Sequence, residues 1–460
     1  MAKSTPQSLV VPYADAFERV AGGLPGAGTP WIDALRRGAV EGLRAEGFPH
    51  RKTEAWKYTD VRRVVQTVFE PAAADDRPLP ADIAADLAET VGEEPAAVFV
   101  NGRFRADLSQ LDGLGKGVHV STLAEGLARD DGLLSSHLGQ LMAIDGMPFA
   151  RLNTALMADG LVLRLDRGAE AAATLHLVSI TLPVVEDGEA VPTAAYPRHL
   201  IVAGANSRAK LVETHLGGGE GGMLAAGLTE ISVGEGARLA HYRHQADSAS
   251  ATNIAAALVR LSKDAVYESF SLVTGAELSR YEAHAVLDGP GADCRISGAY
   301  LVDGNRHADL TIVITHAQPD GRSRQVFKGV LDDQARAAFQ GRIEVAREAQ
   351  RTDGHQLNKA LLLSPKAEID AKPELEIFAD DVKCSHGATA GRLDPQGLFY
   401  LRSRGIDEAV ARRLLVEAFV QDAIDEIEDE AVRARFHAAV SRRLGGGEAA
   451  TLSASEETAA

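Results

Sequence analysis

The segment best suited to chemistry runs from Asp380 to Thr389 and reads DDVKCSHGAT. Its Cys384 and His386 are two positions apart, so they point to the same side of an extended strand. A thiolate and an imidazole are ligands for iron or zinc, and both ligand types occur at iron–sulfur centres. The charge of the adjacent Lys383 is expected to lower the pKa of the thiol.

A cysteine–histidine pair cannot by itself complete a tetrahedral metal site. The spacing therefore predicts either a site that another chain completes or a transient site. The alternative is structural, with Cys384 as a small buried hydrophobe and His386 as a hydrogen-bonded corner residue. The second cysteine, Cys294, alternates with Ala292 and Ile296 and is expected to face the core rather than a metal.

Motifs for other chemistries are absent from the sequence. The glycine-rich stretch Gly217–Gly222 lacks the lysine and the serine or threonine of a phosphate-binding loop, so it predicts a turn and no ATP site in this chain. Neither the G-x-S-x-G turn of serine hydrolases nor the H-E-x-x-H motif of zinc proteases occurs. The chain is thus expected to be non-enzymatic.

The elements that must position the Cys384–His386 segment form a repeat. Short apolar runs, broken by Gly, Asp or Asn, follow one another over residues 164–389. Turns followed by alanine recur at Ala209, Ala237, Ala265 and Ala292, which lie 28, 28 and 27 residues apart. An even period of this length is typical of stacked coils. It predicts a mainly β protein with a flattened β-solenoid core, and an ordinary β-sandwich is the alternative.

Strict alternation in RHADLTIVIT, residues 306–315, predicts which side chains enter the solenoid. Four apolar residues are expected to face inward: Ala308, Leu310, Ile312 and Ile314. Three polar residues are expected to face outward: His307, Asp309 and Thr311.

Helical patterns flank the β region. Thr29 and Pro30 predict the start of a helix that Gly47 ends, and residues 70–94 have the composition of a linker with one short helix. The sequence AVFVNGRFR at residues 97–105 predicts two strands joined by an Asn-Gly turn.

Two amphipathic helices are predicted near the C-terminus. Asp407 is the expected N-cap of the first helix. Its apolar stripe is expected to comprise Val410, Leu414, Leu415, Ala418 and Phe419. The stripe of the second helix is expected to comprise Val432, Phe436, Val440 and Leu444. Such a pair can cap the solenoid and can also offer a docking face to a partner.

These patterns divide the chain into a helical N-terminal domain with a linker at 1–95, a β-helix core at 96–395, a helical partner-docking domain at 396–445 and a disordered tail at 446–460. The 65 acidic and 48 basic residues give a formal charge of −17, which disfavours nucleic acid and anionic membranes as partners. No apolar run reaches the ~20 residues that span a bilayer. With no signal peptide and no disulfide framework, a reducing cytoplasm is the expected location.

The stretch from Lys328 to Phe419 resembles the SufB/SufD family of iron–sulfur cluster assembly proteins of the SUF system. The resemblance rests on KGVLDDQARAAFQGRI at 328–343 and on QLNKALLLSPKAEIDAKPELEIFADDVKCSHGATAGRLDPQGLFYLRSRGI at 356–406. Four shorter segments are similar to the SufD branch rather than the SufB branch: RKTEAWKYT at 51–59, VFVNGRF at 98–104, CSHG at 384–387 and LFYL at 398–401.

This resemblance implies a right-handed parallel β-helix between helical N-terminal and C-terminal domains. It also implies a complex with a SufB-like paralogue and with a SufC-like ATPase that binds the C-terminal helical region. A transient Fe–S cluster would be shared at the interface with the SufB-like chain, with His386 as the first expected ligand and Cys384 as the second. The family complex is associated with reduced flavin, for which this sequence has no motif, and the isolated chain could form a homodimer.

Three other interpretations remain open at this point. The chain could be a SufB-type paralogue, or a structural β-solenoid that binds partners without metal. A third class, β-helix enzymes that cleave acidic polysaccharides, would call for a secretion signal that the sequence does not have.

Overall fold

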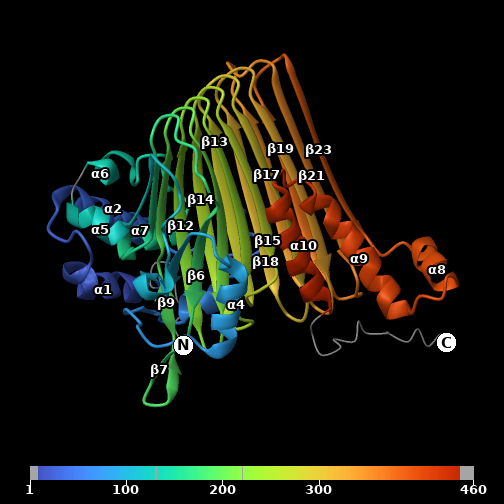
Figure 1. Cartoon of the computed structure of the whole chain (residues 1–460), viewed down its shortest axis with the longest axis horizontal. Coiled ribbons are helices and arrows are strands. Elements are labelled where there is room, and N and C mark those ends of the chain that lie inside the picture. Colours follow the sequence, from blue (N-terminus) through green and yellow to red (C-terminus); the bar gives the residue numbers. More distant parts are fainter. Residues whose placement is uncertain (1–8, 130–131, 220, 446–460) are drawn as a thin grey trace.

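The computed structural model describes residues 9–129, 132–219 and 221–445. At its centre two β-sheets face each other, and the chain alternates between them (Figure 1). About seven turns of this β-solenoid span residues 193–391. The predicted solenoid is confirmed. The sandwich alternative is wrong, because neighbouring strands of each sheet run parallel and belong to successive coils.

The first sheet contains β1 (Glu70–Pro71), β4 (Val118–Thr122), β5 (Leu161–Leu165), β9 (Thr193–Ala195), β10 (Arg198–Ala203), β12 (Met223–Val233), β14 (Ala251–Leu261), β16 (Leu278–Leu287), β18 (His307–His316), β20 (Arg336–Val345) and β22 (Glu368–Ile377). The second sheet contains β2 (Ala96–Val100), β3 (Arg103–Phe104), β6 (Leu175–Thr181), β11 (Arg208–Gly217), β13 (Arg238–Ala246), β15 (Val266–Val273), β17 (Asp293–Val302), β19 (Arg322–Leu331), β21 (Thr352–Leu362) and β23 (Val382–Gly391). A separate hairpin is formed by β7 (Val184–Glu186) and β8 (Glu189–Val191). The last strands, β22 and β23, lie at the same end of the two sheets.

The corners of the coils follow the predicted repeat only in part. Ala237, Ala265 and Ala292 occupy equivalent, fully buried corners in successive coils. Ala209 does not, because the pairing of β11 with β13 places Ser207 at the equivalent corner. Alanine and serine both fit the small space inside the turn, so the spacing of alanines alone misplaced the first corner.

The interior of the solenoid is filled by alternating side chains, as expected. In β18 the four predicted inward residues are at most 1% exposed and join the central apolar core: Ala308, Leu310, Ile312 and Ile314. His307, Asp309 and Thr311 point to the other side of the strand, also as predicted. They do not reach solvent freely, however, because a segment of the N-terminal region covers this part of the sheet.

The N-terminal region contributes most of the remaining helices. These are α1 (Val11–Val20), α2 (Pro30–Glu46), α3 (Arg62–Gln66), α4 (Ala81–Val91), α5 (Leu123–Arg129), α6 (Leu133–His137) and α7 (Pro148–Leu156), with short 3-10 turns at η1 (Ala21–Gly23), η2 (Glu54–Trp56) and η3 (Ala106–Leu108). The predicted helix after Thr29 is α2, and Gly47 ends it with a φ of 75°. Helix α7 packs on β12 and β14 of the first sheet, whereas α4 packs on β11 of the second.

The predicted hairpin after residue 96 is also present. Strands β2 and β3 pair antiparallel around Asn101 and Gly102, whose φ values are 48° and 75°. Two successive positive φ angles are what an Asn-Gly hairpin turn requires. Strand β2 then joins the second sheet beside β6, so this hairpin closes the N-terminal end of that sheet.

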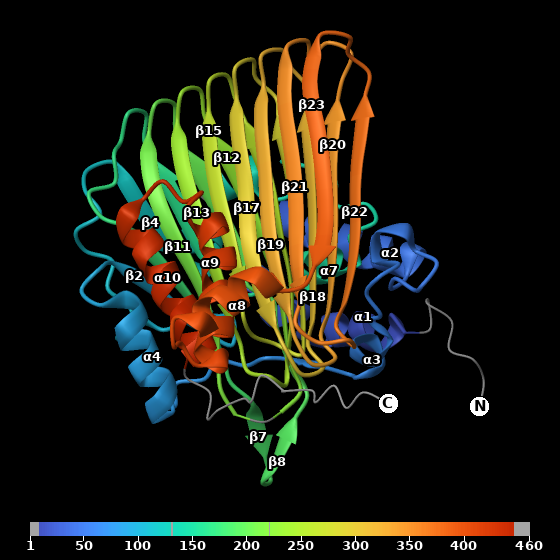
Figure 2. The same cartoon turned by 90° about the vertical axis from the view of Figure 1, so that its right-hand side faces the viewer.

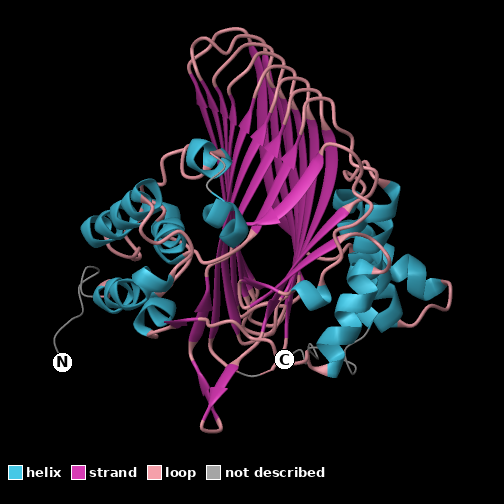
Figure 3. Ribbon diagram, turned by 60° about the vertical axis from the view of Figure 1, so that its left-hand side comes forward, coloured by secondary structure: helices cyan, strands magenta, loops and turns pink. Residues whose placement is uncertain are grey.

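Three helices follow the last coil: α8 (Pro395–Ser403), α9 (Glu408–Ile424) and α10 (Glu430–Gly445). They lie on the side of the solenoid opposite α1, α2 and α7 (Figure 3), whereas α4 is on their own side, where Glu89 forms an ion pair with Arg442 of α10. Asp407 is the N-cap of α9, as predicted, and accepts a hydrogen bond of 2.9 Å from the Ala409 amide. The stripe of α10 is confirmed, since Val432, Phe436 and Val440 are buried against the second sheet and α9.

The predicted stripe of α9 is wrong. Val410 and Leu414 are 36% and 40% exposed. The buried face instead carries Ala411, Val416, Val420, Ala423 and Ile424. The helix is apolar on more than one side, and packing on α10 and the sheet selects the face that spacing alone did not.

None of the described helices is long and apolar enough to cross a bilayer. The predicted disordered tail, 446–460, lies outside the described residues. The division of the chain at residues 95 and 395 stays a proposal.

Candidate functional site

The segment with the candidate ligands forms the last strand of the solenoid. Strand β23 pairs with β21 on one side only, and β22 likewise pairs only with β20 in the part of the chain that is described. Figure 2 looks onto this end, where β22 and β23 are the outermost strands. Ile377, the last residue of β22, and Phe378, which follows it, are 38% and 66% exposed there. An open strand edge beside apolar side chains is a ready surface for pairing with another chain.

Cys384 and His386 lie on the same side of β23, as predicted. Cys384 is aligned with Gly354 and His386 with Gln356 of β21, and Gln356 is a buried, inward-facing residue. Both candidate ligands therefore occupy inward positions of the final coil. His386 is exposed because no further coil of the solenoid covers it.

The structural alternative fits Cys384 only in part and does not fit His386. Cys384 is half-buried and packs at the edge of a small apolar cluster formed by Ile343, Val345 and Ala349. His386 is in the middle of the strand rather than at a corner, and its imidazole makes no hydrogen bond or ion pair with any described residue. Its imidazole is therefore free to take a ligand.

The expected activation of the thiol by Lys383 is wrong. Burial raises the pKa of Cys384, and the charge of Asp353 adds to this, while a hydrogen bond with the Gly354 backbone lowers it. Lys383 is exposed on the opposite side of the strand. Cys384 is therefore a protonated, weakly nucleophilic thiol near neutral pH.

Among the described residues, no three side chains of the His, Cys, Asp or Glu type are placed so that they could hold a metal ion. Cys294 is fully buried in the central core, as predicted, and burial raises the pKa of its thiol. On the outer face beside the site, His355 contacts the Ser385 hydroxyl at 2.7 Å and Asp353 at 2.7 Å. Within one chain the site is therefore a half-site.

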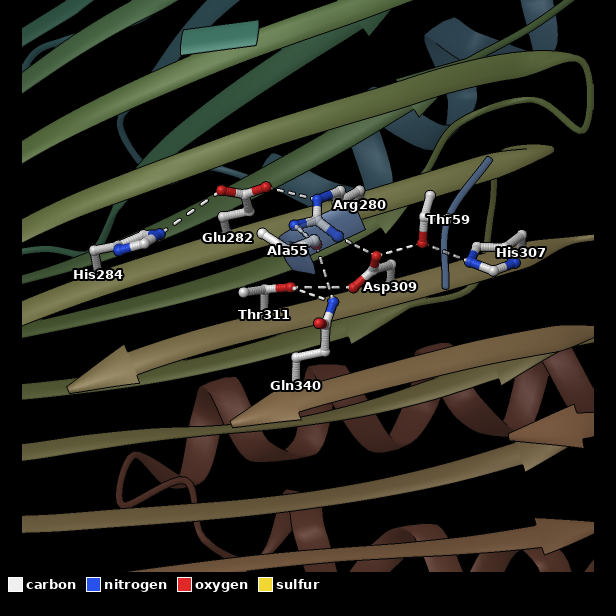
Figure 4. Close-up of polar contacts among 9 residues, drawn as sticks. All are labelled: Ala55, Thr59, Arg280, Glu282, His284, His307, Asp309, Thr311 and Gln340. Atoms are coloured by element: carbon white, nitrogen blue, oxygen red, sulfur yellow. Dashed lines mark hydrogen bonds and ion pairs between the residues drawn. The ribbon is translucent and has the colours of Figure 1, made fainter. Parts of the chain in front are cut away.

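A second polar centre, which the sequence did not reveal, lies where the N-terminal region meets the first sheet (Figure 4). Arg280 of β16 is fully buried and forms ion pairs with Glu282 and with Asp309 of β18. Its guanidinium also lies over the Trp56 ring at 3.9 Å and donates a hydrogen bond of 2.9 Å to the Ala55 carbonyl.

Thr59 completes this network from the same N-terminal segment. Its hydroxyl donates to the Asp309 carboxylate and is 3.0 Å from Nε2 of His307. Gln340 donates to the Ala55 carbonyl at 3.2 Å and to the Thr311 hydroxyl at 3.3 Å. The segment 51–59, singled out by resemblance alone, is thus attached to outward residues of three successive coils. Arg280 and Asp309 are aligned on neighbouring strands. A full alignment of the repeats would have placed these two opposite charges side by side and so indicated this polar centre.

Comparison with known proteins covers nearly the whole chain. Residues 184–419 match the family model described as "SUF system FeS cluster assembly, SufBD core domain". Residues 10–177 match the model of the SufBD protein N-terminal region. This chain belongs to the SufBD family. The resemblance found from the sequence is confirmed, and the chain is an iron–sulfur cluster assembly protein of the SUF system.

Curated relatives agree with this assignment. The iron–sulfur cluster assembly protein SufD of Escherichia coli is 32% identical over 409 residues, which cover 89% of this chain and 92% of the relative. A SufBD family protein of Synechocystis is 31% identical over 423 residues, covering 89% and 90%. The chloroplastic protein ABCI7 of Arabidopsis thaliana is 28% identical over 440 residues, covering 93% and 90%.

Proposed function

We propose that this SufBD family member is a SufD-like scaffold subunit that provides His386 to a nascent iron–sulfur cluster at an interface with a SufB-like chain. The cluster is the cargo of the assembly, and this chain performs no ATP chemistry of its own. The observation that carries the proposal is the position of His386, whose side chain is exposed on the last strand of the solenoid and has no partner among the described residues. A half-site on an unpaired strand edge calls for ligands from another chain.

Three properties of this end support the pairing. Strands β22 and β23 have unpaired backbone groups along one edge. The apolar side chains of Ile377 and Phe378 are exposed beside them. The half-buried Cys384 lies next to His386 and could serve as a second ligand, although its pKa is raised and metal binding would first have to remove the proton.

The His386→Ala variant tests the ligand role. It removes an exposed side chain and should leave folding and co-purification with SufB-like and SufC-like partners intact, while reconstitution from iron and sulfide yields no cluster. Ser385→Ala is the matched control, because Ser385 faces the other side of the same strand and its loss should leave cluster formation at the wild-type level. Cluster formation by His386→Ala at the wild-type rate would exclude the ligand role and favour a metal-free structural solenoid.

The C-terminal helices support a second part of the proposal, the docking of a SufC-like ATPase. Four large apolar side chains of α8 and α9 are exposed there: Phe399 at 75%, Tyr400 at 56%, Leu414 at 40% and Val410 at 36%. Exposed apolar side chains on two helices that pack against each other are typical of a protein-binding surface.

Leu414→Glu tests this docking surface. The substitution places a charge in the exposed apolar face without touching the buried face of α9, so it should abolish co-purification with the ATPase and leave the unfolding midpoint unchanged. Ala438→Glu on the exposed side of α10 is the control and should bind as the wild type does. Equal binding by both variants would contradict the proposed docking face.

A further inference from the structure

A column of polar side chains continues from His386 into the interior of the solenoid. Gln325 of β19, Gln356 of β21 and His386 of β23 are aligned across three neighbouring strands of the second sheet. Phe327 and Ala360, which lie at the same parity as these glutamines on their strands, belong to the central core. All three members of the column therefore face the interior, and one strand spacing of about 4.8 Å separates each from the next.

The two glutamines are buried without using their amides. Gln325 is 0% and Gln356 3% exposed. The side-chain oxygen and nitrogen of both residues make no hydrogen bond with the described residues. Buried polar atoms almost always have a partner, and each one without a partner destabilises the fold. Their retention here points to a role other than packing.

The geometry holds the amide of Gln356 in place. A Cβ atom on Gly341 of β20 would lie 1.4 Å from Nε2 of Gln356. The amide therefore reaches across the interior to the opposite strand and occupies the space that the glycine leaves. A glutamine fixed in this way keeps its hydrogen-bonding amide at a defined position along the solenoid axis, one coil below His386.

The register leaves few competing partners for the imidazole on the inward side of the coil below. Gly354, beneath Cys384, has no side chain. Asn358, beneath Ala388, directs its amide nitrogen to the Tyr300 hydroxyl at 3.5 Å, and its side-chain oxygen has no partner among the described residues. Ser385 is engaged with His355 on the outer face. Gln356 is thus the polar side chain that the register places under His386.

From these observations we infer that Gln356 is the positioning residue of His386, accepting the ring N–H through its side-chain oxygen when the other ring nitrogen binds iron. The inference rests on the proposed ligand role of His386. A ligating histidine uses one ring nitrogen for the metal, and a hydrogen bond from the other nitrogen fixes the tautomer and the orientation of the ring. Gln356 supplies the acceptor, and its orphaned side-chain oxygen gains a partner in the same step.

The test uses the complex with SufB-like and SufC-like partners and titrates it with ferrous iron. Gln356→Leu, which keeps the volume and removes the acceptor, should weaken iron binding by about 10–100-fold. Gln356→Glu keeps an acceptor oxygen and should bind iron close to the wild-type affinity. Gln325→Leu is the matched control, since it removes an equally orphaned amide from the same column without touching His386, and it should bind iron as the wild type does.

A second readout uses the metal-free chain. Both leucine variants remove unsatisfied buried atoms, so neither should lower the thermal unfolding midpoint.

Iron binding by Gln356→Leu at the wild-type affinity, with His386→Ala defective, would overturn the inference and leave the proposed function standing. Wild-type affinity in His386→Ala would overturn both. Equal loss of iron in the two leucine variants would assign the column a purely structural role.

Discussion

Replacing Asp309 by alanine tests how the N-terminal segment is held on the solenoid. Asp309 is 1% exposed, and its carboxylate accepts hydrogen bonds from the side chains of Arg280, Thr59 and Thr311. Removing it leaves the fully buried guanidinium of Arg280 with Glu282 as its remaining carboxylate. Loss of one partner from a buried ion pair costs about 3–5 kcal/mol, because the other charge stays desolvated. We expect the free energy of unfolding to fall by that amount.

Urea unfolding followed by tryptophan fluorescence suits this measurement, since the Trp56 ring lies against Arg280. Glu368→Ala is the control: its ion pair with Arg336 has the same kind of geometry at 2.9 Å, but the two side chains are 57% and 61% exposed. Such a surface pair contributes about 0–1 kcal/mol.

A triple variant, Arg280→Met with Asp309→Leu and Glu282→Gln, separates pairing from packing. It removes all three charges of the buried network and largely fills their volume, so it should be more stable than Asp309→Ala alone. In limited trypsin digestion, Asp309→Ala should be cut faster than the control at the exposed Arg51, Lys52 and Lys57 side chains, because the segment opens locally. A loss below about 1 kcal/mol for Asp309→Ala, equal to that of the control, would refute the reasoning.

Three further outcomes are expected. Burial alone would raise the pKa of Glu282, but Arg280 and the other neighbouring groups lower this pKa to about 2. The ionised carboxylate should therefore add about 3 kcal/mol to the free energy of unfolding above pH ~4.5, and this contribution should be lost as the pH falls toward 2. Urea midpoints of the wild type and of Glu282→Gln across this pH range will show the loss. Phe436→Ala should cost about 3–5 kcal/mol in thermal unfolding, since the ring is 3% exposed and packs between the second sheet and α9. Iodoacetamide should alkylate Cys384 slowly at pH 7 and faster above pH ~9, and should reach Cys294 only after unfolding, which peptide mass mapping will reveal.

Sequence reasoning succeeded where one local rule determines the outcome. Alternation alone separates Ile312 from Asp309, because a strand has only two sides. The Asp407 cap and the Asn101 turn were equally accessible, since in each case the side chain or the φ angle required is set within a few residues. The position of His386 on the same side as Cys384 belongs to this class.

Prediction from the sequence failed where contacts between segments far apart in the chain determine which side chains are buried. The outward side chain of Asp309 is buried by Thr59, which is 250 residues away in the chain. Helix α9 has apolar residues on several sides, so only contact with α10 and the sheet selects Val416 over Leu414. The glutamines beneath His386 were also missed. Alternation along a strand can show that a polar residue faces inward, but it does not show whether its amide has a hydrogen-bond partner.

The proposed cluster site and the proposed docking surface are joined by very little backbone. Strand β23 ends at Gly391 and α8 begins at Pro395, so the strand that carries His386 runs directly into the exposed helix. Helix α9 is in turn attached to the second sheet by the ion pair of Lys328 with Asp422 at 2.5 Å, and the turn after α9 by that of Arg324 with Glu426 at 2.9 Å. Under the proposed function, a displacement of these helices by the ATPase reaches the last coil both through the chain and through the sheet. Because His386 is on the coil that has no neighbour on its outer side, it is the interior position that such a displacement can move at the least cost in packing.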